Sequence, residues 1–227
     1  MLDYVVVKLP RFAFEKFPEV DDTLGIQIKS VGETMAIGRT FRSAGQKGFR
    51  GLETGRHGWV TGKRLEDDGL ESDDRKALLR AIRRPTANRP FQLKRALEAG
   101  VSPEEIFEAT KIDPWFIDQL QQILEWETRF RDAETVGPEL LRRMKREGFS
   151  DRQLAELRNE EEGEVRARRW GLGIHPTYNV VDTCAGEFPA ETPYYYSSYE
   201  DQDESNPSDR EKIVVLGSGP NRIGQGI

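Results

Sequence analysis

The sequence contains few of the residues on which many protein classes depend. Of its 227 residues, one is cysteine and two are histidine. The single cysteine, Cys184, excludes an internal disulfide and fits a reducing compartment, so we expect a cytoplasmic protein. Neither His57 nor His175 has a partner at metal-ligand spacing. We therefore expect no metal site and no catalytic Ser/His/Asp or Cys/His group.

Long apolar runs are also absent. No stretch approaches the ~20 apolar residues of a membrane helix. The first residues lack the basic head, apolar run and small-residue cleavage site of a signal peptide. Charged residues make up 33% of the chain, hydrophobic residues 36% and aromatic residues 9%. This composition favours a soluble, helix-rich protein that is long enough to bury a core.

Charge is unevenly distributed along the chain. The net charge of −6 argues against nucleic-acid binding by bulk electrostatics, yet residues 75–95 hold eight basic residues and no acidic one. That run is either a nucleic-acid patch on a helical module or a set of partners for ion pairs within or between chains. Only Phe91 is interleaved with the basic residues, and acidic clusters lie at 66–68, 160–162 and 200–204. The pattern favours ion pairing.

The first part of the chain alternates in the manner of β-strands. We expect strands over Tyr4–Leu9 and Ile26–Ile37, where β-branched and apolar residues recur. Arg39–Glu53 should then form a helix. Gly45 and Gly48 lie inside that helix, and a glycine in a helix interior costs about 0.5–1 kcal/mol.

From Ser72 to about Trp170 the local signals indicate helices. Three segments start with a capping residue, and Ser102, Asp113 and Ser150 are the expected N-caps. The first and third of these starts lie 48 residues apart, and each follows a glycine, Gly100 or Gly148. Either the helical hairpin is duplicated, or two unrelated helices share ordinary capping rules.

The last part of the chain ends in a glycine-rich loop. Lys212–Leu216 (KIVVL) predicts a short strand that leads into GSGPNRIGQG. Glycines let a backbone approach a phosphate, but Arg222 occupies the third glycine's place in a strict G-x-G-x-x-G. The pattern therefore favours a tight structural turn over dinucleotide binding. Because an α/β unit cannot close on one strand, the sequence reads as the middle of a larger protein.

Several stretches together resemble one known family. DYVVVKLPRFAFEKF, QIKSVGETMAIGRTF and KGFRGLETG are similar to the end of the first ATP-grasp half of carbamoyl-phosphate synthetase large subunits. GVSPEEIFEATKIDPWF resembles their central oligomerisation domain. TYNVVDTCAGEFPAETPYYYSSYE and KIVVLGSGPNRIGQGI resemble the junction into the second half. The resemblance covers nearly all of the chain in the right order, and the combination of these motifs is specific.

The resemblance implies the fold class and the domains. We expect a mainly α chain, with a central helical oligomerisation domain flanked by partial α/β structure. Residues 1–55 would be the C-terminal tail of the first, carboxyphosphate-forming ATP-grasp half. Residues 56–205 would be the helical oligomerisation domain with its linker. Residues 206–227 would be the pre-ATP-grasp strand and glycine loop that begin the second, carbamoyl-phosphate half.

The resemblance also implies a parent enzyme. Such a ligase makes carbamoyl phosphate from bicarbonate, glutamine-derived ammonia and two molecules of ATP, for arginine and pyrimidine biosynthesis. Its cofactors are ATP, magnesium or manganese, and potassium, and its partners are further copies of itself and a glutaminase subunit or domain. No catalytic or metal-binding residue of the family falls on these positions. We therefore expect a scaffold that is inactive alone, holds no cofactor and binds neither nucleic acid nor membrane.

One functional site is carried over by the resemblance, namely the loop that lines the family's internal carbamate passage. Gly226 is the foremost candidate, because a side chain there would narrow the passage. The loop residues that we assign to it are Gly217, Gly219, Asn221, Arg222, Gly224 and Gly226.

The sequence departs from the family pattern at four positions. Gly45 and Gly48 stand where leucine and alanine are usual, which puts the stability of the Arg39–Glu53 helix in question. Asn179 replaces a usual lysine, and Gly186 replaces a usual alanine.

Overall fold

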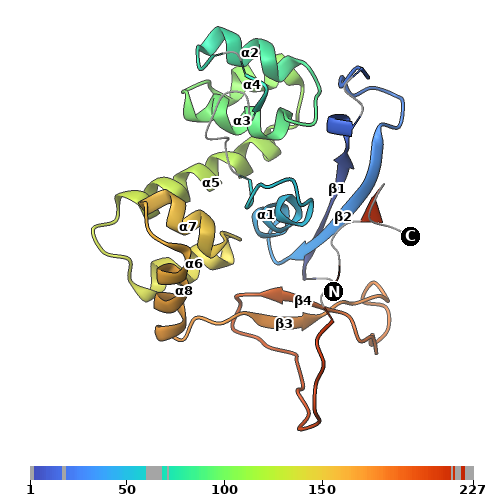
Figure 1. The fold of residues 1–227 in the computed structure, drawn as a ribbon, viewed down its shortest axis with the longest axis vertical. Helices are drawn as coiled ribbons and strands as arrows, with labels where there is room; N and C mark the ends of the chain where they lie inside the picture. The colour runs from blue at the N-terminus through green and yellow to red at the C-terminus, as the bar shows by residue number, and fades with distance from the viewer. Residues whose placement is uncertain are drawn as a thin grey trace.

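The computed structural model describes residues 3–16, 19–59, 68–70, 72–215, 217 and 221–222, with the backbone alone at 15, 221 and 222. Within these ranges the chain is mostly helical, with eight α-helices, a three-stranded sheet and a two-stranded sheet. The expected mainly α fold is confirmed. Figure 1 shows the helices on one side of the molecule and the strands on the other.

The N-terminal strands form an antiparallel pair. β1 (Val5–Phe12) pairs with β2 (Ser30–Gly38), and a short 3-10 helix, η1 (Phe14–Lys16), follows β1. The second expected strand was placed too early, because Ile26 and Ile28 lie outside β2 with their side chains fully exposed. The pairing with β1 ends at Ser30, so the preceding residues have no partner strand there.

The expected helix after β2 is confirmed as α1 (Phe41–Gly51), capped by the Thr40 side chain. Its glycines let it lie close to its neighbours. A Cβ on Gly48 would come within 2.7 Å of Leu9 Cδ1 on β1, and a Cβ on Gly45 within 3.4 Å of the Trp59 ring. Glycine lowers the intrinsic helix propensity of α1, but it also allows α1 to pack close to β1 and Trp59.

Seven helices make up the helical domain, and Figure 1 shows the long α5 crossing between two groups of shorter ones. Their bounds are α2 (Arg75–Arg83), α3 (Arg89–Glu98), α4 (Pro103–Thr110), α5 (Pro114–Asp132), α6 (Pro138–Arg146), α7 (Asp151–Arg158) and α8 (Glu162–Gly171). All three expected N-caps are confirmed. Ser102 and Ser150 form full capping boxes, and the Asp113 side chain accepts from the Trp115 backbone N–H.

Two segments of the helical domain repeat the same local structure 48 residues apart. We call them the first copy (residues 89–117) and the second copy (residues 137–165). Each has a left-handed glycine, an eight-residue helix and a left-handed C-cap, Lys111 in one and Asn159 in the other. The matched apolar positions are buried in both copies: Leu93 with Leu141, Ala96 with Met144, Val101 with Phe149, Ile106 with Leu154 and Ile117 with Val165. Because core positions match as well as caps, the duplicated hairpin is the better of the two interpretations.

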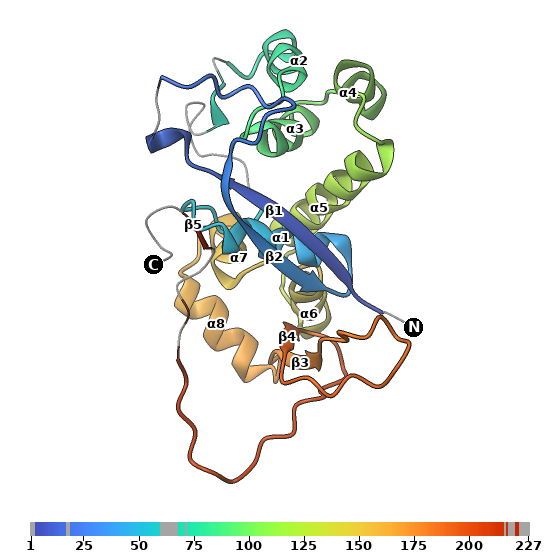
Figure 2. The ribbon, with the colours of Figure 1, turned by 90° about the vertical axis from the view of Figure 1, so that its right-hand side faces the viewer.

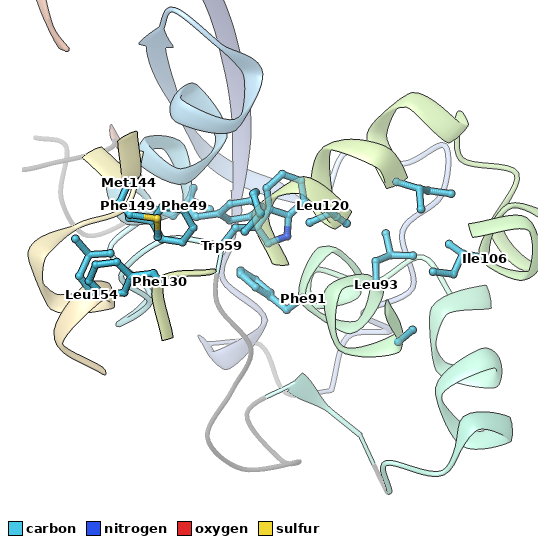
Figure 3. Close-up of a cluster of buried hydrophobic side chains, with 14 of the residues drawn as sticks. Phe49, Trp59, Phe91, Leu93, Ile106, Leu120, Phe130, Met144, Phe149 and Leu154 are labelled. Carbon is cyan, nitrogen blue, oxygen red and sulfur yellow. The ribbon is translucent and has the colours of Figure 1, made fainter. Parts of the chain in front are cut away.

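One hydrophobic core runs through the helical domain and reaches α1. Figure 3 shows Leu154, Phe130, Met144 and Phe149 at one end, and Leu93 and Ile106 at the other. Phe49 of α1 lies between them with Trp59 and Phe91, at ring distances of 4.8 and 4.9 Å. The two copies are thus joined through aromatic residues from α1 and the segment that follows it.

A short antiparallel pair follows the helices, β3 (Thr177–Val180) with β4 (Tyr195–Ser198). Asn179, which departs from the family pattern, is buried in it. Its amide donates to the Gln202 carbonyl and accepts from the Ser198 hydroxyl, a role that a lysine could not fill in the same way.

The expected strand over Lys212–Leu216 is wrong for residues 212–215, and Leu216 lies outside the described residues. Ile213, Val214 and Val215 have 79–92% of their surface exposed, and no strand pairs with them. A β-strand needs a hydrogen-bonded neighbour, and the described part of the chain offers none here.

Candidate functional site

Two residues of the predicted loop pair with an N-terminal strand. Asn221 and Arg222 form β5, which pairs antiparallel with β2 through Glu33 and Gly32. Figure 2 shows β5 close to β2. Gly217 is described and its Cα faces open space, whereas Gly219, Gly224 and Gly226 lie outside the described residues. The structure therefore joins the two ends of the chain in one sheet, while the assignment of the loop to a carbamate passage stays a prediction.

The first buried contact between α1 and the helical domain is an ion pair. Arg42 Nε donates to Glu147 Oε2 at 2.5 Å, and Arg42 Nη1 donates to the Gln119 amide oxygen at 2.8 Å. Both charged side chains are largely buried, with 12% and 3% of their surface exposed. Arg143 also reaches Glu147, at 2.8 Å. A buried pair of this kind is costly to break from one side.

A buried amide network lies beside that ion pair. Gln46 of α1 is fully buried, and its side-chain oxygen accepts from the Gln153 amide at 2.7 Å and from the Trp59 backbone N–H at 3.2 Å. Its own amide donates to the Glu147 carbonyl at 3.4 Å. The polar groups of α1 and of the second copy therefore satisfy one another, which fixes the angle at which the two parts meet.

Gly148 lets α1 approach this closely. Its φ is +93°, and a Cβ there would lie 2.7 Å from the Ser43 Cα. The positive φ and the close approach of Ser43 both favour glycine, because glycine tolerates left-handed backbone and has no side chain. Gly148 also receives a hydrogen bond on its carbonyl from Arg50, at 2.8 Å.

The segments next to the β3–β4 pair contact both the N-terminal part of the chain and the second copy. The Tyr4 hydroxyl donates to the Asp182 carbonyl at 2.9 Å, which ties it to the N-terminus. Arg146 of α6 donates to the Tyr199 carbonyl at 3.1 Å and pairs with Glu200 and Asp201. These contacts hold the N-terminal strands, the second copy and the C-terminal strands in one arrangement. We call the region where the N-terminal strands, α1, the second copy and the β3–β4 pair meet the junction.

Sequence reasoning did not find the junction. Arg42, Gln46 and Arg50 are polar residues on a short helix, and such residues usually face solvent. The glycines of α1 do not mark it either, because Gly45 and Gly48 face Trp59 and Leu9 and not the second copy.

Half of the eight basic residues at 75–95 form ion pairs within the described part of the chain, in line with the ion-pair interpretation. Arg75 pairs with Glu105, and Arg95 pairs with Asp73 at 2.6 Å. Arg84 meets Asp21 and Asp22, and the fully buried Lys94 meets Glu127 at 2.7 Å. Charges that are already neutralised offer little to phosphates. No observation on the described residues favours the nucleic-acid alternative.

The described residues were also searched for metal-binding groups. A search of them finds no group of three His, Cys, Asp or Glu side chains that could hold a metal ion. His175 lies edge-on to the Trp170 ring, with the ring centres 5.0 Å apart. Among the same residues no helix combines the length and the apolar character that crossing a bilayer requires.

Comparison with known proteins assigns the chain to a family. Residues 33–173 match the model described as the carbamoyl-phosphate synthetase large chain, oligomerisation domain. The chain belongs to this family. It is 54% identical to the carbamoyl phosphate synthase large chain of Gemmatimonas aurantiaca, 49% identical to that of Archaeoglobus fulgidus and 53% identical to that of Kineococcus radiotolerans.

The alignments to these relatives cover all of the chain but only 20–21% of each relative. The chain thus spans about a fifth of the length of the carbamoyl phosphate synthase large chains it matches. The family model begins at Glu33, inside β2, and ends at Gly173, after α8. It therefore includes α1 and both copies, and with them the contacts between α1 and the second copy.

Proposed function

We propose that this chain is the central scaffold of a carbamoyl-phosphate synthetase large chain, which holds two catalytic halves in register. One observation carries the proposal. The whole chain aligns with a fifth of the relatives' length, and its middle matches their oligomerisation domain. The junction supports it, because buried polar contacts are suited to fixing the angle between neighbouring parts.

The proposed domain boundaries are those expected from the sequence. Residues 1–55 form the end of the first ATP-grasp half, 56–205 the oligomerisation domain with its linker, and 206–227 the start of the second half. The pairing of β5 with β2 supports a place where the two halves meet.

The parent activity follows from the same proposal. The full-length protein makes carbamoyl phosphate from bicarbonate, ATP and glutamine-derived ammonia in the cytoplasm, for arginine and pyrimidine synthesis. It uses magnesium or manganese and potassium, and a glutaminase subunit or domain supplies ammonia. This segment contributes no catalytic residue. An assay of the segment alone should give no carbamoyl phosphate, and activity there would contradict the scaffold proposal.

Self-association is the second part of the proposal. The matched family is an oligomerisation domain, and the chain carries exposed aromatic residues such as Trp115 and Trp170. Sedimentation velocity over a range of concentrations should show a dimer or larger species. A monomer at every concentration would remove this part of the proposal.

The glycine loop is proposed to line the passage for carbamate between the halves. In the full-length protein, Gly226→Phe should lower the yield of carbamoyl phosphate per ATP hydrolysed, because the side chain would narrow the passage. Gly163→Phe is the matched control, since Gly163 on α8 faces open space. An unchanged yield in Gly226→Phe would refute the assignment of the loop.

A further inference from the structure

A cavity of about 610 Å³ lies within the junction. It is bounded by β2, α1, the second copy, and β4 with the residue that follows it. The side chains that give it chemical character are those of Lys47, Arg50, Lys145, Asp151, Glu162 and Tyr199. Neither the scaffold proposal nor the predicted glycine loop uses this cavity.

Two of its cations have only neutral partners. Lys47 Nζ donates to the Ile37 carbonyl at 2.7 Å and to the Ser197 carbonyl. Arg50 Nη1 donates to the Gly148 carbonyl and to the Gln153 amide oxygen. Among the described residues no carboxylate forms an ion pair with Lys47 or Arg50, and Asp151 acts on Arg50 only as a more distant charge. Buried cations without a counter-ion are costly, because carbonyl dipoles do not cancel a full charge.

Among the described residues that line the cavity, the one buried carboxylate already has two cationic partners. Asp151 accepts from Lys145 at 2.8 Å and from Arg169 at 2.9 Å. Glu162, at the rim, pairs with Arg166. Three cations therefore line the cavity (Lys47, Arg50 and Lys145), and its two lining carboxylates, Asp151 and Glu162, are already paired with Arg169 and Arg166 outside the lining. The cavity has a surplus of positive charge.

The charged and titratable groups that face these lysines come from every neighbouring element. They are Arg50, Asp151, Glu162, Arg169, Tyr196 and Tyr199. Burial, with the nearby Arg50, lowers the pKa of Lys47 to about 8. Burial, partly offset by Asp151, likewise lowers the pKa of Lys145 to about 8. The lowered pKa values therefore reflect chiefly the cost of burying a charged amine, and for Lys47 the repulsion from Arg50 adds to it.

We infer that this cavity is a binding site for a small oxyanion of the phosphate class. A dianion would supply the counter-charge that Lys47 and Arg50 lack, and the hydroxyls of Thr34 and Ser197 line the same space. Because the cavity joins α1, the second copy and β4, a bound anion would hold these parts together. The inference concerns a ligand and does not rest on the proposed enzyme activity.

Sulfate is the sharpest probe, because its charge stays constant while the lysines titrate. Isothermal titration calorimetry on the full-length protein and on this chain, with chloride at matched ionic strength as the reference, should detect binding near pH 7. Raising the pH to about 9 should weaken it about tenfold or more, because Lys47 and Lys145 lose protons above their pKa values. Equal affinity at both pH values would overturn the inference.

A matched pair of variants locates the site. Lys47→Gln removes one cation and keeps an amide donor for the carbonyls, and it should weaken sulfate binding at least tenfold. Lys76→Gln changes an exposed lysine on α2 that does not line the cavity, and it should leave binding unchanged. Equal affinity in the two variants would show an adventitious ion only.

A measurement on the unchanged protein covers the case in which Lys47→Gln does not fold. In ¹³C NMR, sulfate should raise the pKa of Lys47 from about 8, because a bound anion favours the charged amine. An unmoved pKa would overturn the inference. If sulfate binds this chain but not the full-length protein, a carboxylate from the flanking sequence fills the cavity, and the inference is also wrong.

Discussion

The two copies in the helical domain differ in what they contact, although their local structure is the same. Gly100 of the first copy faces open space, whereas Gly148 of the second lies against the backbone of α1. The residue before each glycine is likewise exposed in the first copy and buried in the second. Ala99 is exposed, and Glu147 is buried in an ion pair with Arg42.

This difference shows how one local design can serve two purposes. In the first copy the caps and apolar positions stabilise a helical hairpin, and its glycine makes no close contact with another element. In the second copy the same hairpin forms the junction through a buried acid and a close backbone approach. The specialised contacts of the second copy lie at positions whose counterparts in the first copy are exposed. Substitutions at matched positions therefore test the comparison directly.

The largest effect is expected at Glu147. Glu147→Ala gives the second copy the residue of the first, and it leaves the largely buried Arg42 with only the Gln119 amide as an acceptor. Loss of one partner of a buried pair costs about 3–5 kcal/mol in the free energy of unfolding. The reverse change, Ala99→Glu, should stay within about 0.5 kcal/mol, because Ala99 is exposed. Urea unfolding measures both, and similar losses would contradict the comparison.

Substitutions of the two glycines should differ less in their effect on the free energy of unfolding. Gly100→Ala should cost about 1 kcal/mol, because its φ of +79° is left-handed and nothing crowds the new methyl group. Gly148→Ala should cost about 2–3 kcal/mol, since the methyl group would also overlap Ser43 and push α1 away. Thermal and urea unfolding give the two values. Equal losses would mean that the close approach at Gly148 adds nothing.

The smallest difference is expected between the capping serines. Ser102→Ala removes a cap alone and should cost about 1 kcal/mol. Ser150→Ala also removes a hydrogen bond from its hydroxyl to the His57 carbonyl, at 3.2 Å, and should cost about 1–2 kcal/mol. Threonine at either position should restore most of the loss. A larger loss at Ser102 than at Ser150 would contradict the expected order.

Much of the fold could be read from the sequence because its signals are local. The caps at Ser102, Asp113 and Ser150 depend on residues within one turn, and each was placed correctly. The ends of the chain were harder. The strand expected at Lys212–Leu216 has apolar residues in the right pattern, but a strand forms only when another strand is present to pair with it.

The candidate site was predictable only in part. The sequence drew attention to the glycine loop, and β5 places two of its residues beside β2. The sequence did not indicate the cavity, because its cations belong to no shared motif. Lys47 and Arg50 lie on α1, whereas Lys145 follows Lys47 by 98 positions. Charged residues on short helices usually face solvent, so their burial becomes visible only when α1 and the second copy are brought together.

The sequence by itself determined where helices start, which faces are apolar and to which family the motifs point. These properties depend on hydrogen bonds and packing within a few residues, and so they are the same in both copies. The tertiary structure decided which copy meets α1, which acid is buried and where the surplus charge gathers. Those outcomes depend on contacts between residues about 100 positions apart, such as Arg42 and Glu147, and no local pattern encodes them.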